Sequence, residues 1–150
     1  MATAATRGTS ALTASVMSRV TAAAAGGVAG GLVFGMMMQA MGMIPMVAQL
    51  VGSSSTAVGW VVHLAISAVI GGLFGVITTR FSGGTLTMVG AGAGYGMVWW
   101  VLGPLLLMPA KLGMPLFTID SMAWKSLMGH IIFGMVLGAV SWALGRRATA

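Results

Sequence analysis

Four long apolar segments, separated by short polar stretches, constrain this chain more than any other feature of its sequence. A helix needs about 20 mainly apolar residues to cross the hydrocarbon core of a bilayer. The first three segments contain no charged residue, and the fourth has only Lys125 near its start. The sequence therefore predicts an all-α integral membrane protein, a bundle of four transmembrane helices. The spans are expected at about residues 20–46, 59–79, 86–108 and 122–144.

The scarcity of charge indicates that lipid covers most of this chain. Charged residues make up 5% of the 150 residues, whereas soluble domains carry roughly 25%. So few charges cannot cover a water-facing surface, and the lipid bilayer is the first expected partner. We expect one membrane domain over residues 20–145. It is flanked by a disordered cytoplasmic tail at residues 1–19 and a second cytoplasmic tail at residues 146–150.

The basic residues gather on one side of the predicted membrane. Cytoplasmic segments next to transmembrane helices are enriched in Lys and Arg. Both termini are therefore expected in the cytoplasm, with the protein in a bacterial cytoplasmic membrane. The net charge of +6 is spread along the chain without forming a patch, which argues against nucleic acid as a partner. The predicted cytoplasmic side holds Arg7, Arg19, Arg80, Arg146 and Arg147, and the other side holds Lys111, Lys125 and Asp120.

The two halves of the chain resemble each other, which suggests two repeated helical hairpins as one form of the bundle. In this alignment His63 corresponds to Ser126, and Ser67 corresponds to His130. Repeats with an even number of spans keep the same orientation in the membrane. The second and fourth helices would then be equivalent, and they would face each other near the axis of the bundle.

A stripe of glycines marks each of the four predicted helices. Small residues four positions apart leave a flat face, on which another helix backbone can approach closely. One alternative is packing within the chain, and the other is packing against other membrane helices or a second copy. The predicted packing residues are Gly31 and Gly35 with their aligned counterparts Gly92 and Gly96, Gly71 and Gly75 with Gly134 and Gly138, and Ser67 and Ser126.

The two histidines, His63 and His130, lie inside apolar spans on the glycine faces of their helices. An ionisable side chain at membrane depth is costly, which makes each one a candidate site residue. In one interpretation they only hydrogen-bond across the helix interface, His63 to Ser126 and His130 to Ser67. In the other, both imidazoles bind a cofactor, either copper or haem b, for which histidine is a common ligand. A role in proton relay or substrate binding is a third alternative.

Methionine is unusually frequent, with 15 residues in the chain. Thioethers are soft ligands that favour Cu(I). The predicted topology places several methionines on the same outer side as both histidines. The alternative is that methionine is a flexible filler beside the glycine faces. The predicted metal site consists of His63, His130, Met43, Met46 and Met108.

The inventory of reactive side chains favours a non-enzymatic protein. The chain has no cysteine, which excludes thiolate metal sites and cysteine nucleophiles. Asp120 is the only acid, so neither a carboxylate pair nor a Ser-His-acid triad at membrane depth can form within one chain. The first predicted function is a small membrane protein that binds copper or haem. The alternatives are a structural or accessory subunit packed through its glycine stripes, and a small oligomeric channel or carrier.

Overall fold

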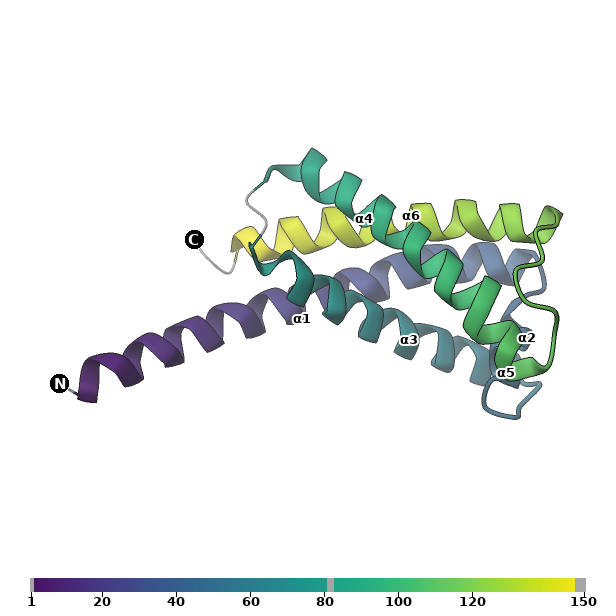
Figure 1. Cartoon of the computed structure of the whole chain (residues 1–150), viewed down its shortest axis with the longest axis horizontal. Helices are drawn as coiled ribbons and strands as arrows, with labels where there is room; N and C mark the ends of the chain where they lie inside the picture. Colours follow the sequence, from purple (N-terminus) through teal and green to yellow (C-terminus); the bar gives the residue numbers. More distant parts are fainter. Residues whose placement is uncertain (1, 81–82, 148–150) are drawn as a thin grey trace.

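The computed structural model describes residues 2–80 and 83–147, with the backbone alone at residues 2–15, 80 and 147. Over these ranges the chain forms helices and no strand (Figure 1). Four helices are long, and short helical segments connect or extend them. The long helices are α1 (Ala2–Ala40), α3 (Thr56–Ile77), α4 (Thr85–Leu102) and α6 (Ser121–Arg147). The short ones are α2 (Ile44–Gln49), η1 (Thr78–Arg80), η2 (Gly103–Leu107) and α5 (Met108–Leu112).

Four helical stretches are long and apolar enough to cross a membrane, which confirms the predicted four-helix membrane bundle. They are Val16–Ala40, Thr56–Ile77, Thr85–Leu112 and Ser121–Arg146. The first span ends earlier than predicted, because Gly42 takes a positive φ of 71° and the chain turns before α2. The third continues beyond α4 through a π turn at η2, where Pro104 has no N–H to donate to a regular helix.

The N-terminal part of α1 extends beyond the bundle (Figure 1). Helix α1 begins at Ala2 and so includes residues for which we expected a disordered tail. Disorder of residues 1–19 in water stays a prediction. At the bundle itself, the end of α6 lies at the same end as the start of α4, and α2 and α5 lie at the opposite end. The side of the membrane that each end faces also stays a prediction.

The long helices pack in the order α3, α1, α6, α4, with the most extensive packing between neighbours in this row. The second and fourth spans were expected to face each other, and this is wrong because α1 lies between α3 and α6. The outer two helices, α3 and α4, meet at Tyr95, whose hydroxyl donates to the carbonyl oxygen of Ile70 at 2.9 Å. The Tyr95 ring also packs on Phe74, with centroids 5.2 Å apart.

Glycines bring the backbones of each hairpin into contact. A Cβ atom on Gly27 of α1 would lie 2.9 Å from the Cα of Gly71 of α3. In the second hairpin, a Cβ on Gly92 would clash with the carbonyl oxygen of Gly134, and a Cβ on Gly134 with that of Gly92. Backbones this close allow weak Cα–H···O contacts between helices. The backbone of the other helix in the hairpin is also met by Gly75, Gly96 and Gly138, whereas Gly31 and Gly35 lie against the side chains of Ser67 and Trp60.

The two hairpins pack in different registers. In the first hairpin, a Cβ on Gly31 would meet the side chain of Ser67. The aligned counterparts of these two residues are Gly92 and His130, so an exact repeat would place Gly92 against His130. Instead Gly92 lies against Gly134, and His130 lies against Gly96. Compared with the first hairpin, the two helices of the second hairpin are therefore shifted along each other by at least one turn. Common ancestry of the two hairpins stays a prediction.

Candidate functional site

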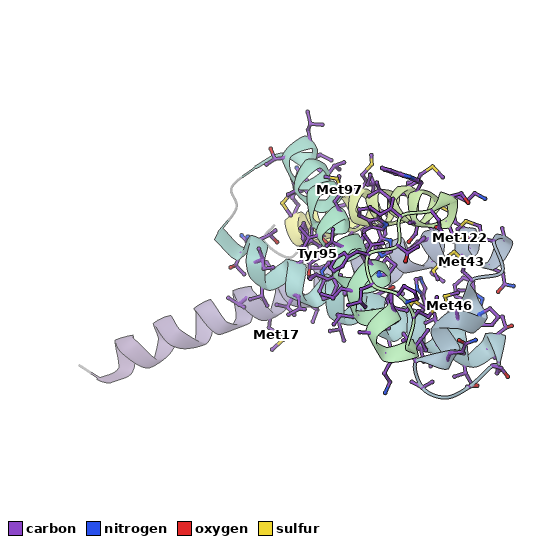
Figure 2. The ribbon with its side chains drawn as sticks, turned by 45° about the vertical axis from the view of Figure 1, so that its right-hand side comes forward. Met17, Met43, Met46, Tyr95, Met97 and Met122 are labelled. Atoms are coloured by element: carbon purple, nitrogen blue, oxygen red, sulfur yellow. The ribbon has the colours of Figure 1, made fainter. Side chains whose placement is uncertain are left out.

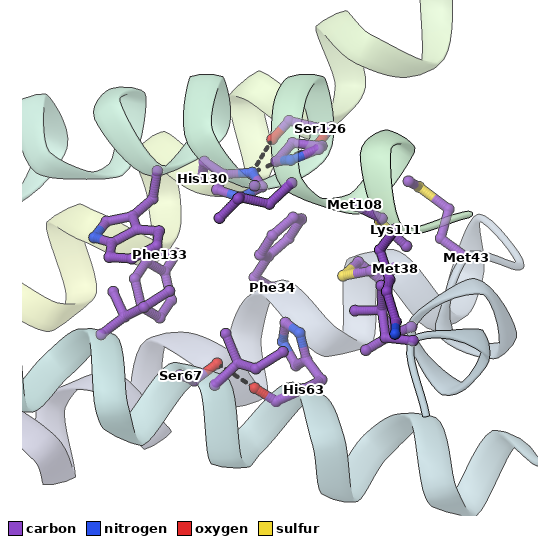
Figure 3. A pocket seen from close by; sticks show the side chains of 18 residues that line it. Phe34, Met38, Met43, His63, Ser67, Met108, Lys111, Ser126, His130 and Phe133 are labelled. Atoms are coloured by element: carbon purple, nitrogen blue, oxygen red, sulfur yellow. Dashed lines mark hydrogen bonds between the residues drawn. The ribbon is translucent and has the colours of Figure 1, made fainter. Parts of the chain in front are cut away.

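A cavity of about 420 Å³ lies between α3 and α4 (Figure 3). Phe34 and Met38 of α1 line its inner side, and side chains of α6 line it next to α4. Residues of α2, η2 and α5 close the end near the connecting loops. The cavity thus lies within the membrane-spanning part of the bundle, toward the end opposite the termini.

α3 and α4 approach each other less closely than α1 and α6 do. Between α1 and α6, a Cβ on Gly30 would lie 2.6 Å from the carbonyl oxygen of Phe133, and a Cβ on Gly26 would lie 2.9 Å from that of Leu137. The facing side chains of α3 and α4 include Ile70 and Trp99, which are large. The cavity lies beside these two side chains and is lined near η2 by Gly103, Pro104 and Leu107.

The lining is mainly apolar, with a few polar side chains. Among the described residues that line the cavity there is no acid. Lys111 of α5 is exposed and is the only cation in the lining. Figure 3 shows its side chain beside Met38, Met43 and Met108. The polar lining residues are His63, Ser67, Lys111, Ser126 and His130.

His63 joins α3 to α1. Its side chain is buried, with 8% of its surface exposed. The Nε2 atom lies 2.9 Å from the carbonyl oxygen of Gly31. A carbonyl oxygen can only accept, so Nε2 carries the proton and donates it. Ser67 does not bond to His130 as one interpretation predicted, because its hydroxyl donates to the His63 carbonyl one turn earlier at 2.8 Å.

His130 bonds within its own helix. Its Nδ1 lies 2.8 Å from the carbonyl oxygen of Ser126, to which it donates, and 3.4 Å from the Ser126 hydroxyl oxygen. The predicted bond between His63 and Ser126 is therefore wrong as well. Both corrections have the same physical reason: α1 separates α3 from α6, so each serine bonds to nearby groups of its own helix.

The ring of Phe34 lies between the two imidazoles (Figure 3). Its centroid is 5.7 Å from that of His63 and 4.7 Å from that of His130, in edge-on contact with both. A metal ion must lie about 2 Å from each ligating nitrogen, and a haem needs room for its macrocycle between two axial ligands. The structure does not bring the two histidines together around such a group.

The predicted methionine ligands are only partly gathered at the cavity. Met43 and Met108 line it, together with Met38, which the sequence did not single out, whereas Met46 does not line it. Figure 2 shows Met43 and Met46 toward one end of the molecule, with Met17 far away along α1. Within the described part of the chain, no group of three or more His, Cys, Asp or Glu side chains could hold a metal ion.

Each histidine keeps one ring nitrogen that makes no hydrogen bond to the described residues. These atoms are Nδ1 of His63 and Nε2 of His130, since the other nitrogen of each ring donates to a carbonyl. Among the described residues, every buried side-chain nitrogen or oxygen atom has a hydrogen-bond partner. Both residues line the cavity, and we infer that a ligand there can reach these two nitrogens.

Phe34, Trp99 and Lys111 are functional candidates that sequence reasoning missed. Trp99 and Lys111 line the cavity from α4 and α5, and Phe34 lines it from α1. The one available signal was Trp99 in the middle of its span, because a large aromatic residue there can hold neighbouring helices apart.

Comparisons of the chain with protein-family models, curated proteins and solved structures found no match. Function has to be inferred from the cavity and its lining.

Proposed function

We propose that this chain is a non-enzymatic membrane protein that binds an amphiphilic small molecule from the lipid phase, in the cavity between α3 and α4. The observation that carries this proposal is the cavity itself. Its volume of about 420 Å³ falls within the range of roughly 300–1,000 Å³ that is typical of small-molecule sites. Such sites combine an apolar lining with a few polar groups, as this one does.

The position of the rim supports entry from the membrane. Ile66 on α3 and Leu107 on η2 line the cavity, and 41% and 56% of their surfaces are exposed. Both belong to spans that are apolar enough to lie in a bilayer. An apolar chain could therefore pass from the surrounding lipid into the cavity without crossing water.

Lys111 supports the amphiphilic character of the ligand. It lies in the last turn of α5, at the end of the third span. The aliphatic stem of a lysine can lie along apolar surface while its ammonium group reaches the interface. With no acid among the described lining residues, this ammonium can attract a polar or anionic head group.

The other predicted functions have less support. Copper or haem b at His63 and His130 conflicts with the position of Phe34. A subunit that packs on partners through its glycine stripes would need those faces to be free. The predicted glycines of both hairpins instead contact helices of the same chain.

Photo-crosslinking tests the proposal. The full chain is reconstituted into nanodiscs with a long-chain alcohol that carries a diazirine, and the labelled residues are identified by mass spectrometry. We expect labelling of Ile66, Leu107 and Met108 that is saturable and is competed by excess unlabelled alcohol. Labelling spread over all lipid-facing residues, without competition, would contradict the proposal.

A pair of glycine variants provides the matched control. Gly103 lines the cavity, and a Cβ atom there would meet no atom within 4 Å. Gly94 of α4 has equally open space but does not line the cavity. We expect Gly103→Leu to fill part of the cavity and reduce the competed labelling several-fold. Gly94→Leu should leave it unchanged.

A further inference from the structure

The hydrogen bonds of the two histidines determine what the cavity can offer a ligand. In His63 the proton is on Nε2, and in His130 it is on Nδ1, because each of these atoms donates to a carbonyl oxygen. A neutral imidazole has one donor and one acceptor. Nδ1 of His63 and Nε2 of His130 are therefore acceptors.

Neither acceptor has a hydrogen-bond partner among the described residues. Ser67 donates its hydroxyl proton to the His63 carbonyl, so its donor is already used. The imidazoles come from different helices, and both lie edge-on to Phe34. A plain acyl chain in the cavity would leave both nitrogens without a hydrogen bond, at a cost in free energy.

The remaining lining is suited to a ring. Phe34, Trp99 and Phe133 come from three different helices and all line the cavity. Aromatic pairs are stabilised in offset or edge-on arrangements at centroid distances of roughly 4.5–7 Å. An aromatic head group could make such contacts while its substituents reach the histidines.

We propose that the ligand presents a phenol or hydroquinone head group, whose hydroxyl donates to Nδ1 of His63 or Nε2 of His130, and carries an apolar tail. This inference rests on the proposed function, because it specifies the ligand of the same cavity. It concerns binding only. The acceptors select for a hydroxyl donor, the aromatic side chains select for a ring, and the apolar remainder of the lining holds the tail.

A matched pair of probes tests the inference. An alkyl hydroquinone and its dimethyl ether have the same ring and tail, but the ether has no hydroxyl donor. Their affinities for the full chain in nanodiscs are measured by equilibrium dialysis against empty nanodiscs. We expect the hydroquinone to bind about fivefold or more tightly, as one net hydrogen bond predicts.

Two variants identify the acceptors. His130→Phe keeps a ring and removes both nitrogens, losing only a bond within α6. His63→Phe likewise keeps a ring and removes both nitrogens, losing the bond to the Gly31 carbonyl. We expect at least one of them to abolish the preference for hydroquinone over ether while leaving ether binding unchanged. Ser141→Ala is the control, since it removes a bond to an α6 carbonyl from a residue outside the cavity.

The outcomes separate the two proposals. Equal binding of hydroquinone and ether, or a preference that survives in both histidine variants, would overturn the inference and leave the amphiphile site intact. The inference would also be overturned, and the amphiphile site left intact, if neither probe binds while the diazirine alcohol still labels the cavity. If the alcohol also fails to label it, the proposed function fails.

Discussion

At the scale of single residues, Phe34 decides what the two histidines can do. Its ring is buried, 5% exposed, and lies edge-on to both imidazoles. The ring also contacts α6 beside His130, where a Cβ on Gly129 would clash with it. The ring keeps the histidines apart and fills the space at the centre of the site. Each imidazole is consequently fixed by its own carbonyl bond and not by the other histidine.

Phe34→Ala should therefore destabilise the bundle strongly. Removing a buried phenylalanine costs about 3–5 kcal/mol, through lost contacts and the cavity that is left. Unfolding in mixed micelles of increasing SDS content, followed by tryptophan fluorescence, measures the change. Leu32→Ala is the control, because Leu32 lies on the same helix with 45% of its surface exposed. Equal effects of the two substitutions would show that Phe34 is not part of the core.

The position of Phe34 also predicts little bound transition metal. We expect elemental analysis of the purified protein to find copper and iron well below one atom per chain, even after growth in supplemented medium. The reason is that the two imidazoles cannot reach one ion with the ring between them. Near-stoichiometric metal in the wild type that is lost in His63→Ala and His130→Ala would refute this.

At the scale of elements, the tightness of each helix pair depends on which residues face the neighbouring helix. Gly92 and Gly134 let α4 and α6 touch through their backbones. Gly90 lies only two residues from Gly92, yet a Cβ there would meet no atom within 4 Å. A side chain therefore fits at Gly90 but not at Gly92, although both glycines lie in α4.

Gly92→Leu should disrupt the second hairpin, and Gly90→Leu should be nearly neutral. A side chain at Gly92 must push α6 away and separate every contact along that pair of helices. We expect a loss of more than about 2 kcal/mol for Gly92→Leu, as for other overpacked sites, and less than about 0.5 kcal/mol for Gly90→Leu. The same SDS titration measures both, and similar values for the two variants would contradict the packing described above.

The sequence predicted the elements better than their arrangement. The four spans follow from the length and apolarity of local segments, so they were predictable, apart from ends fixed by Gly42 and Pro104. The order of the helices depends on which glycine face meets which helix, and every span carries such a face. The cavity was not predictable either, since Phe34 and Trp99 are far apart in the chain and line one cavity only in the folded bundle.

At the scale of the whole molecule, the bundle combines three tight helix pairs with one open pair. Glycine contacts hold α3 on α1, α1 on α6, and α6 on α4. The remaining pair, α3 and α4, is held at Tyr95 and is open beyond it toward η2. A ligand that fills the open part would contact both outer helices, so we expect it to stabilise the bundle.

The membrane orientation decides which leaflet supplies that ligand. The cavity lies toward the end of the bundle that carries α2 and α5. The distribution of Arg and Lys in the sequence predicts that this end is outside and that the termini are in the cytoplasm. On this prediction the ligand enters from the outer leaflet.

Single cysteines test this orientation directly, because the chain has no cysteine of its own. Ser54 lies in the connection from α2 to α3, Thr118 lies in the connection from α5 to α6, and Thr85 is the first residue of α4; all three are exposed. We expect a membrane-impermeant maleimide to label Ser54→Cys and Thr118→Cys in intact cells, and Thr85→Cys only after lysis. The reverse pattern would place the cavity in the cytoplasmic leaflet. Lys111 would then face a surface rich in anionic lipids, which would favour an anionic amphiphile as ligand over a neutral phenol.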